Sequence, residues 1–137
     1  MSGNLLLKPI VIGFAILTAS CSNQVALLDQ TTAKGDAFTT GLANEYRKIA
    51  RFEAFEMVDW KDAEHFAAKG LAAASGLHVT PEDPDKRQTP REALGDLKEG
   101  RRRLVAILET GVRYGDPETS ARAQARFDCW VEQQEEN

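Results

Sequence analysis

The sequence predicts an all-α protein. Apolar side chains recur at spacings of three and four residues, as on one face of a helix, and no segment alternates between apolar and polar residues as a half-buried strand does. The chain has 137 residues, which is enough for one small domain. We expect antiparallel helix pairs, arranged as a four-helix bundle or as a TPR-like array of helical hairpins, after an N-terminal signal or anchor segment.

Residues 1–20 are typical of a bacterial export signal. The stretch from Pro9 to Ala19 has no charged side chain, and Lys8 precedes it. A helix needs about 20 apolar residues to cross a bilayer. This stretch is shorter, so it fits the apolar core of a secretory signal better than a membrane span.

The end of the signal, Leu17-Thr18-Ala19-Ser20-Cys21, resembles a bacterial lipobox. Its two small residues let a peptidase approach the backbone, and the thiol of Cys21 would accept a diacylglyceryl group before cleavage. The family usually has Leu where Thr18 stands. The alternative is an ordinary cleaved signal or an uncleaved anchor, with Cys21 incidental. By the same resemblance, Ser22 permits sorting to the outer membrane, where Asp at this place favours inner-membrane retention.

Residues 21–38 are small and polar for the most part and predict a tether, and residues 39–137 predict the helical periplasmic domain. The first helix is expected from about Thr40 to Met57. Its inward stripe would be Leu42, Tyr46, Ile49, Phe52 and Phe55. A second helix is expected from Asp59 or Trp60 to near Ser75, capped by Asp59 and stopped by Gly76.

Residues 77–88 predict a linker, because Pro81 and Pro84 disfavour regular structure, and we expect it to be the most mobile internal segment. For the third helix, Thr89 supplies a capping hydroxyl, Pro90 occupies the first helical position and Gly115 marks the end. A fourth helix should begin after Asp116. The core-facing residues expected on it are Ala123, Phe127 and Trp130.

No catalytic, cofactor or metal constellation is visible, so we expect no enzyme. The net charge is −4, and the three arginines of the run 101–103 would point about 100° apart on a helix, which disfavours nucleic acid as a partner. His65 and His78 are too few for a metal site. The acidic groups at 82, 83 and 85 and at 132, 135 and 136 are expected to be solvated, with no raised pKa.

Cys129 is the second cysteine of the chain and lies between Asp128 and Trp130. Exported compartments are oxidising, so an unpaired thiol is unusual there. If Cys21 carries lipid, Cys129 is either buried or has a partner beyond Asn137.

The run from Ala123 to Glu136, which contains Phe-Asp-Cys-Trp, resembles a segment of alphaproteobacterial OmpA-family lipoproteins of the peptidoglycan-associated type. The stretch from Phe52 to Ala67 and the segment Pro81-Glu82-Asp83-Pro84 are also similar to that group. The resemblance covers about Tyr46 to Asn137, together with the lipobox.

In that family, a helical region of this kind precedes an OmpA-like domain that binds peptidoglycan. The 137 residues do not contain that domain, so the resemblance assigns peptidoglycan binding to no residue of this sequence. It implies an outer-membrane lipoprotein with a helical module on the periplasmic face. It also implies a possible disulfide between Cys129 and a downstream cysteine that is absent from this sequence.

The leading expectation is therefore a palmitate-modified lipoprotein of the cell envelope. It would be anchored in the outer membrane through Cys21 and would serve as an interaction or spacer module for an envelope protein partner. The alternative is a periplasmic TPR-like protein-binding module without a lipid anchor. An enzyme or metal protein would require Asp62, Glu64 and His65 to meet another carboxylate in a pocket.

Overall fold

The computed structural model describes residues 23–136, which form helices and, within that range, no strand. The elements are α1 (Gln24–Gln30), α2 (Ala37–Phe52), the π-helix η1 (Glu53–Met57), α3 (Trp60–Ala74), the 3₁₀ turn η2 (Pro84–Lys86), α4 (Arg91–Ile107), the π-helix η3 (Leu108–Val112), α5 (Arg113–Gly115) and α6 (Pro117–Glu136). The all-α class is confirmed. The finer choice between a four-helix bundle and a TPR-like array stays a prediction.

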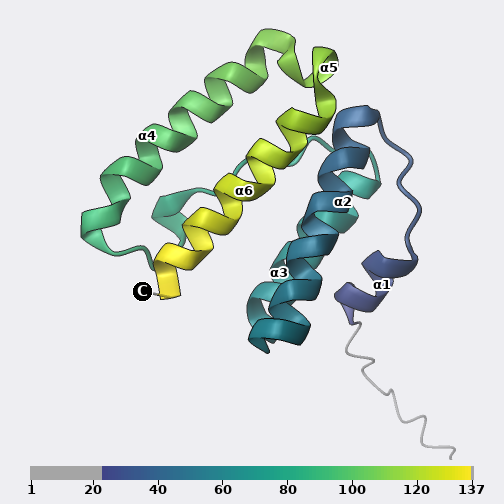
Figure 1. The fold of residues 1–137 in the computed structure, drawn as a ribbon, viewed down its shortest axis with the longest axis horizontal. Coiled ribbons are helices and arrows are strands. Elements are labelled where there is room, and N and C mark those ends of the chain that lie inside the picture. Colours follow the sequence, from purple (N-terminus) through teal and green to yellow (C-terminus); the bar gives the residue numbers. More distant parts are fainter. Residues whose placement is uncertain (1–22, 137) are drawn as a thin grey trace, which may run out of the picture.

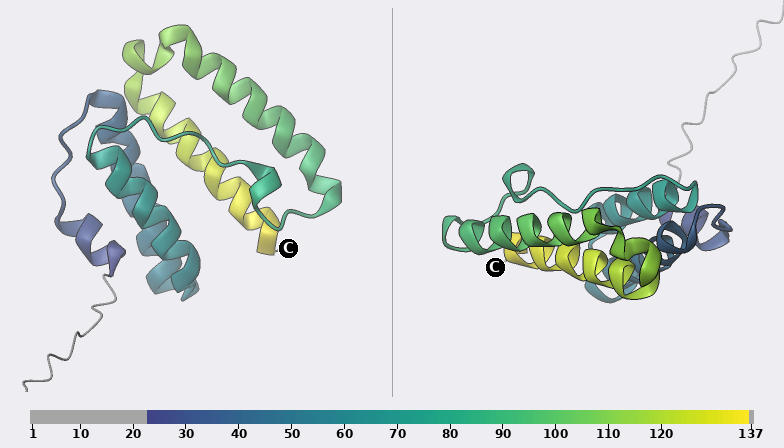
Figure 2. Two further views of the ribbon diagram at one scale, coloured as in Figure 1. Left: turned by 180° about the vertical axis from the view of Figure 1, so that it is seen from behind. Right: turned by 90° about the horizontal axis from the view of Figure 1, so that it is seen from above.

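The helices form two hairpins that lie side by side (Figure 1). One hairpin pairs α2 with α3 and the other pairs α4 with α6, while α2 and α6 pack against each other and join the two. Seen from above, the molecule is much flatter than it is long (Figure 2). The linker, residues 77–90, runs back along the molecule from the end of α3 to the start of α4.

The largest part of the core lies between α2 and α3. α2 contributes Phe38, Leu42 and Tyr46, which are fully buried, and α3 contributes Phe66 with several alanines. Small residues on α3 permit close approach of the neighbouring helices. A Cβ atom placed on Gly70 would lie 2.5 Å from Cδ2 of Leu28, so a larger residue there would force the Leu28 side chain between α1 and α3 to shift.

Most of the predicted helix ends are confirmed. The Asp59 carboxylate accepts a hydrogen bond from the backbone N–H of Asp62 at 3.0 Å and caps α3. Gly76 ends the same helix with a φ of 94°, a conformation that glycine adopts without a steric penalty. Asp116 caps α6 through the N–H of Thr119, although the preceding helix already bends at Gly111, whose φ is 90°.

Part of the predicted tether is folded, so that expectation is wrong for residues 24–30. These residues form α1, which packs across α3, and Val25 and Leu28 are buried in the core. Two apolar side chains spaced three residues apart suffice for this, because they fall on one face of a helix that a neighbour covers.

Phe52 and Phe55 lie outside the core, contrary to the predicted inward stripe. The inward face of α2 is set by Leu42, Tyr46 and Ala50, and it continues at spacings of three and four to Glu53 and Ala54. Phe52 and Phe55 fall beside this face. Glu53 and Ala54 are buried instead, while Phe52 and Phe55 are 45 % and 57 % exposed.

The predicted core face of the fourth helix is also partly wrong. Phe127 is buried, but Ala123 is exposed and Trp130 is 41 % exposed. The inward positions on α6 are Ser120, Ala121, Gln124, Ala125, Phe127, Asp128, Val131 and Glu132. Several of these are polar, so a stripe of apolar residues could not locate this face.

The linker is held in place, contrary to the expectation of mobility, because Glu82 and Pro84 are buried. Thr89 does not cap α4. Its hydroxyl donates to the carbonyl oxygen of Pro84 at 3.1 Å, and α4 begins at Arg91 without a side-chain cap. None of the helices within residues 23–136 combines the length and the apolar character that a membrane span requires.

Candidate functional site

The predicted lipidation residue, Cys21, lies outside the described residues. The described chain begins at Asn23, whose side chain caps α1 by accepting from the N–H of Ala26 at 2.9 Å. The backbone N–H of Gln24 then donates to both carboxylate oxygens of Glu64, at 3.2 and 3.1 Å. The start of α1 is thus fixed to α3 three residues after Cys21.

A set of polar side chains, the linker network, joins the linker to three helices. Its members are His65 and Lys69 on α3, Glu82 in the linker, Asp128 on α6 and Tyr46 on α2. The Nζ atom of Lys69 lies 2.6 Å from Oε1 of Glu82 and 2.7 Å from Oδ2 of Asp128. His65 Nε2 lies 2.7 Å from the same Glu82 oxygen.

Asp128 is the centre of the linker network. It is fully buried, and its carboxylate accepts from the Tyr46 hydroxyl and, at 2.8 Å, from the backbone N–H of Glu82. Gln124 donates to the Tyr46 oxygen at 3.2 Å and to the carbonyl of Val79 at 2.7 Å. The Asp128 side chain on α6 therefore contacts α2, α3 and the linker at the same time.

The pKa values in the linker network depend on two opposing effects: burial disfavours the charged carboxylates, and pairing with Lys69 and His65 favours them. Burial by itself raises the pKa of Glu82, but the hydrogen bond to His65 and the charge of Lys69 outweigh it and lower the pKa to about 2. Burial raises the pKa of Asp128, and Lys69 opposes that rise. The pKa of Tyr46 lies well above its ordinary value, because the phenol is buried beside Asp128.

Arg87, near the end of the linker that precedes α4, pairs with carboxylates on two helices. Its guanidinium lies 2.7 Å from Asp62 on α3 and 2.6 Å from Glu135 on α6. The acidic residue Asp62 is thus engaged in an ion pair, whereas its neighbours Glu64 and His65 have the separate partners described above. Since the three side chains meet different groups, they do not form the single constellation that an enzyme or metal site would need.

Two further carboxyl groups, Glu53 on η1 and Glu132 on α6, are buried without full pairing, and we refer to them as the carboxyl pair. Both oxygens of Glu132 and Oε2 of Glu53 have no hydrogen-bond partner among the described residues. Burial raises the pKa of Glu132 to about 8, and repulsion from the carboxylates of Glu53, Glu136 and Asp62 adds to this rise. Burial and nearby carboxylates raise that of Glu53 to about 7.

The expectation that residues 82, 132 and 135 are solvated is therefore wrong, as is the expectation that no pKa is raised. A sequence signal did exist. Glu53 follows Ala50 by three residues and Tyr46 by seven, and Glu132 follows Asp128 by four, so each continues an inward helical face. Sequence inspection missed this because charged residues count as outward by default.

Cys129 is half-buried, and its thiol is free among the described residues. Burial, with Glu132 and Glu53 nearby, raises its pKa to about 11. A thiol with such a pKa is almost entirely protonated at neutral pH, so it is a poor nucleophile and a poor metal ligand. The two alternatives that the sequence left open for this residue, burial and a partner beyond Asn137, both stay predictions.

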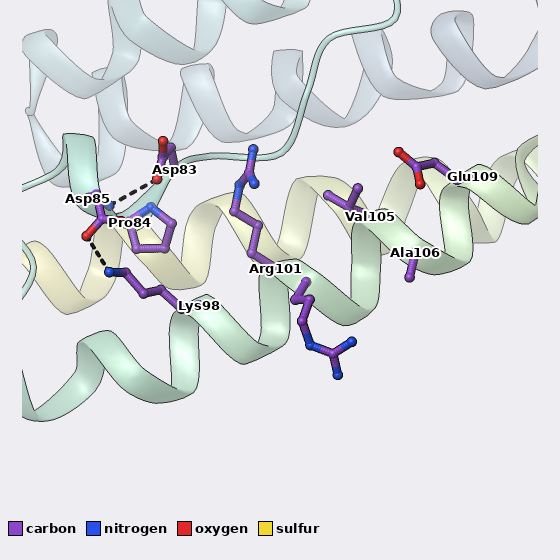
Figure 3. Close-up of a pocket in the computed structure, with 9 residues that line it drawn as sticks. Asp83, Pro84, Asp85, Lys98, Arg101, Val105, Ala106 and Glu109 are labelled. Atoms are coloured by element: carbon purple, nitrogen blue, oxygen red, sulfur yellow. Dashed lines mark hydrogen bonds and ion pairs between the residues drawn. The ribbon is translucent and has the colours of Figure 1, made fainter.

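A groove of about 500 Å³ lies between the linker and α4 (Figure 3). Lys98 pairs with Asp85 at one end, and Glu109 lies towards the other. Arg101 points from α4 towards the linker and donates from Nε to the carbonyl of Glu82 at 2.8 Å. The lining carries charges of both signs that are partly paired, so the groove favours no ligand of a single charge.

An exposed apolar surface, the η1 patch, lies where the α2–α3 hairpin turns. It consists of Phe52, Phe55, Met57, Val58 and Trp60, which are between 44 % and 68 % exposed. The rings of Phe55 and Trp60 meet edge to face, with centroids 6.0 Å apart. Sequence inspection missed this patch because it assigned both phenylalanines to the core.

The described part of the chain thus offers two kinds of feature. The linker network and Arg87 are closed systems of ion pairs, and their polar atoms are already engaged with one another. Within residues 23–136, no group of three or more His, Cys, Asp or Glu side chains is placed to hold a metal ion. The η1 patch, in contrast, has no partner within the described chain. As an exposed apolar patch, it is the strongest candidate for an interaction surface.

No protein-family model matches this chain, and no curated protein or solved structure shows significant similarity to it.

Proposed function

We propose that this chain is a lipoprotein of the bacterial cell envelope, anchored in the outer membrane through Cys21, with a non-enzymatic helical module on the periplasmic face. The observation that carries the proposal is Cys21 itself, which follows two small residues at the end of an uncharged apolar stretch. Anchoring by acyl chains gains about 0.8 kcal/mol for each buried CH₂ group, so a cysteine that receives more than one chain is held firmly.

The folded part supports a binding or spacing role rather than catalysis. Its buried charges are arranged to hold helices and linker together: Lys69 is shared between two carboxylates, and Arg87 bridges two helices. A module of this kind presents surfaces to an envelope partner and keeps its shape while attached to a membrane.

The test is metabolic labelling with radioactive palmitate during expression of the full chain in a bacterial host. We expect label on the wild-type protein and on the Cys129→Ser variant, and none on Cys21→Ser, because only Cys21 lies in the lipobox. Mass spectrometry of the first mature residue should show the acyl groups directly.

Palmitate incorporation that survives Cys21→Ser would contradict the lipidation proposal. So would a wild-type protein recovered from the soluble fraction with an unmodified first residue.

A second candidate is a periplasmic protein-binding module without a lipid anchor, and the groove between the linker and α4 favours it. Its lining of Asp85, Lys98, Arg101 and Glu109 suits a peptide with both charge signs. On this view, Cys21→Ser leaves the fractionation of the protein unchanged, which separates the two candidates.

A further inference from the structure

We propose that the η1 patch rests on the lipid surface into which Cys21 is anchored, so that the module lies directly on the bilayer. This inference rests on the proposed function, because it takes the lipid on Cys21 as given. It goes beyond that function because it names the face of the module that contacts the membrane. It also places the domain directly at the anchor, without the tether that the sequence predicted.

The first argument is the composition of the patch. It contains two phenylalanines, a methionine, a valine and a tryptophan, and none of them is less than 44 % exposed. Side chains of this kind are enriched on protein faces that enter the boundary between headgroups and acyl chains, and tryptophan in particular has an apolar ring with a polar N–H. Five such residues within nine positions differ from the single exposed apolar residues that are normal on a surface.

The second argument is backbone strain at the centre of the patch. Val58 has a φ of 59° and is 68 % exposed. A β-branched residue is costly in the left-handed region, where glycine or asparagine fits without strain. The left-handed backbone ends the η1 helix, with the N–H of Val58 bonded to the carbonyl of Glu53, and it turns the valine side chain outwards into the patch.

The third argument is the short reach of the anchor. Cys21 stands three residues before Gln24, and three residues span at most about 11 Å even when fully extended. The N–H of Gln24 is hydrogen-bonded to Glu64, which lies one helical turn, about 6 Å along the axis, beyond Trp60. A lipid on Cys21 would therefore attach within about 11 Å of the start of α1, which is bonded to α3 one turn beyond Trp60.

The arrangement of the helices agrees with this reach. The turn between α2 and α3 lies at the lower end of the molecule in Figure 1, and the described chain begins at the same end, below α1. The view from behind in Figure 2 shows the same relation. The start of α2 and the end of α3 lie at the opposite end of this hairpin.

Two basic residues flank the patch, each in an exposed ion pair that phosphate headgroups could compete for. Arg51 lies over the Phe55 ring, 5.5 Å from its centre, and pairs with Asp29. Lys61 follows Trp60, has a side chain that is 72 % exposed and lies 3.4 Å from Glu135. Long basic side chains beside aromatic rings reach phosphates while the rings enter the apolar layer. Glu56 is the exposed acidic residue within the patch, and the carboxylate of Asp59 already caps α3.

The experiment uses the two tryptophans of the chain as matched reporters. The full chain is produced as the lipoprotein and reconstituted into phosphatidylethanolamine–phosphatidylglycerol vesicles, with and without brominated acyl chains. The Trp130→Phe variant reports Trp60, which is 44 % exposed, and Trp60→Phe reports Trp130, which is 41 % exposed. We expect brominated chains to lower the Trp60 fluorescence about twofold and to leave that of Trp130 nearly unchanged.

A second set of variants tests whether the quenching of Trp60 depends on the patch and not on a change of fold. In the Trp130→Phe background, Phe55→Ser with Met57→Ser should abolish most of the Trp60 quenching. Leu77→Ser, at the opposite end of the α2–α3 hairpin and 62 % exposed, should leave it intact. All three altered side chains are exposed, so the fold should persist, and circular dichroism checks it.

The outcomes separate this inference from the proposed function. Equal quenching of the two tryptophans in a protein whose mass carries the lipid on Cys21 would overturn the membrane face and leave the anchor standing. Trp60 shielded from an aqueous quencher but untouched by brominated chains would also overturn it and would indicate a protein partner, such as a second copy. A first residue without lipid would overturn both.

Discussion

At the scale of single residues, Val58 shows how the turn between α2 and α3 is built. It is the one non-glycine residue within 23–136 that has a positive φ. The π-helical turn of η1 ends there, and its N–H bonds back to the carbonyl of Glu53. A left-handed residue at this point is the common way to end a helix, but it is usually glycine.

We therefore expect Val58→Gly to stabilise the fold by about 1 kcal/mol, since it relieves the left-handed strain at the cost of a more flexible unfolded chain. Urea unfolding of the detergent-solubilised protein measures this change. The control is Val112→Gly, because Val112 is also exposed but has an α-helical φ of −55°. That variant should lose about 0.5 kcal/mol. A loss of stability in Val58→Gly would contradict the strain at this position.

At the scale of elements, the linker behaves as a fixed part of the fold. Sequence inspection located the linker through Pro81 and Pro84, but it could not identify the contacts that hold the linker in place. Glu82 and Arg87 each bridge the linker to the helices, and Asp128 binds the backbone of Glu82 directly. A proline-rich segment without regular structure is thus ordered by charged side chains.

We expect Asp128→Asn to destabilise the protein by about 3 kcal/mol, because it breaks a buried ion pair and leaves Lys69 with one partner fewer. Hydrogen exchange should also become faster in residues 77–88. Asp85→Asn is the control, since the Asp85 side chain is 56 % exposed where it pairs with Lys98 and such a pair contributes little. Unchanged stability in Asp128→Asn would show that the linker is held by packing alone.

At the scale of the whole molecule, the carboxyl pair lies between the two hairpins and links their packing to pH. Both groups have a higher pKa in the folded state than the ordinary value of 4.5, at about 7 for Glu53 and about 8 for Glu132. The folded state therefore binds their protons more tightly than the unfolded state does. Their favourable contribution is complete below pH 4.5 and is lost as the pH rises through 7 and 8.

Glu82 acts in the opposite direction, because its pKa is lowered to about 2. Its contribution is complete above pH 4.5 and is lost as the pH falls towards 2. The two effects together give a protein whose stability is greatest in mildly acidic solution and falls on both sides.

We expect Glu132→Gln to raise the stability at pH 8 by about 2 kcal/mol and to change it little at pH 5, because the amide need not hold a proton to stay neutral. Urea unfolding at both pH values provides the measurement. Glu118→Gln, on the same helix and 87 % exposed, should have no such effect. A Glu132→Gln protein that is equally affected at pH 5 and pH 8 would rule out titration as the cause.

The sequence by itself determined the four long helices α2, α3, α4 and α6 and many of their ends. These depend on local spacing, on caps such as Asp59 and Asp116, and on Gly76, and local interactions are readable from neighbours in the chain. It also provides the export pattern around Cys21, which a peptidase would read as a short linear segment. These are features in which a residue and its partner lie within a few positions.

Only the tertiary structure decided which charged residues face inwards and what they meet. Tyr46 and Asp128 are 82 positions apart, and no periodic pattern predicts that they share a hydrogen bond. Phe52 and Phe55 lie on the surface instead of in the expected core, and Glu53 lies inside. Burial of a charge depends on partners from distant elements, and the free energy of such a contact appears only when the helices are packed.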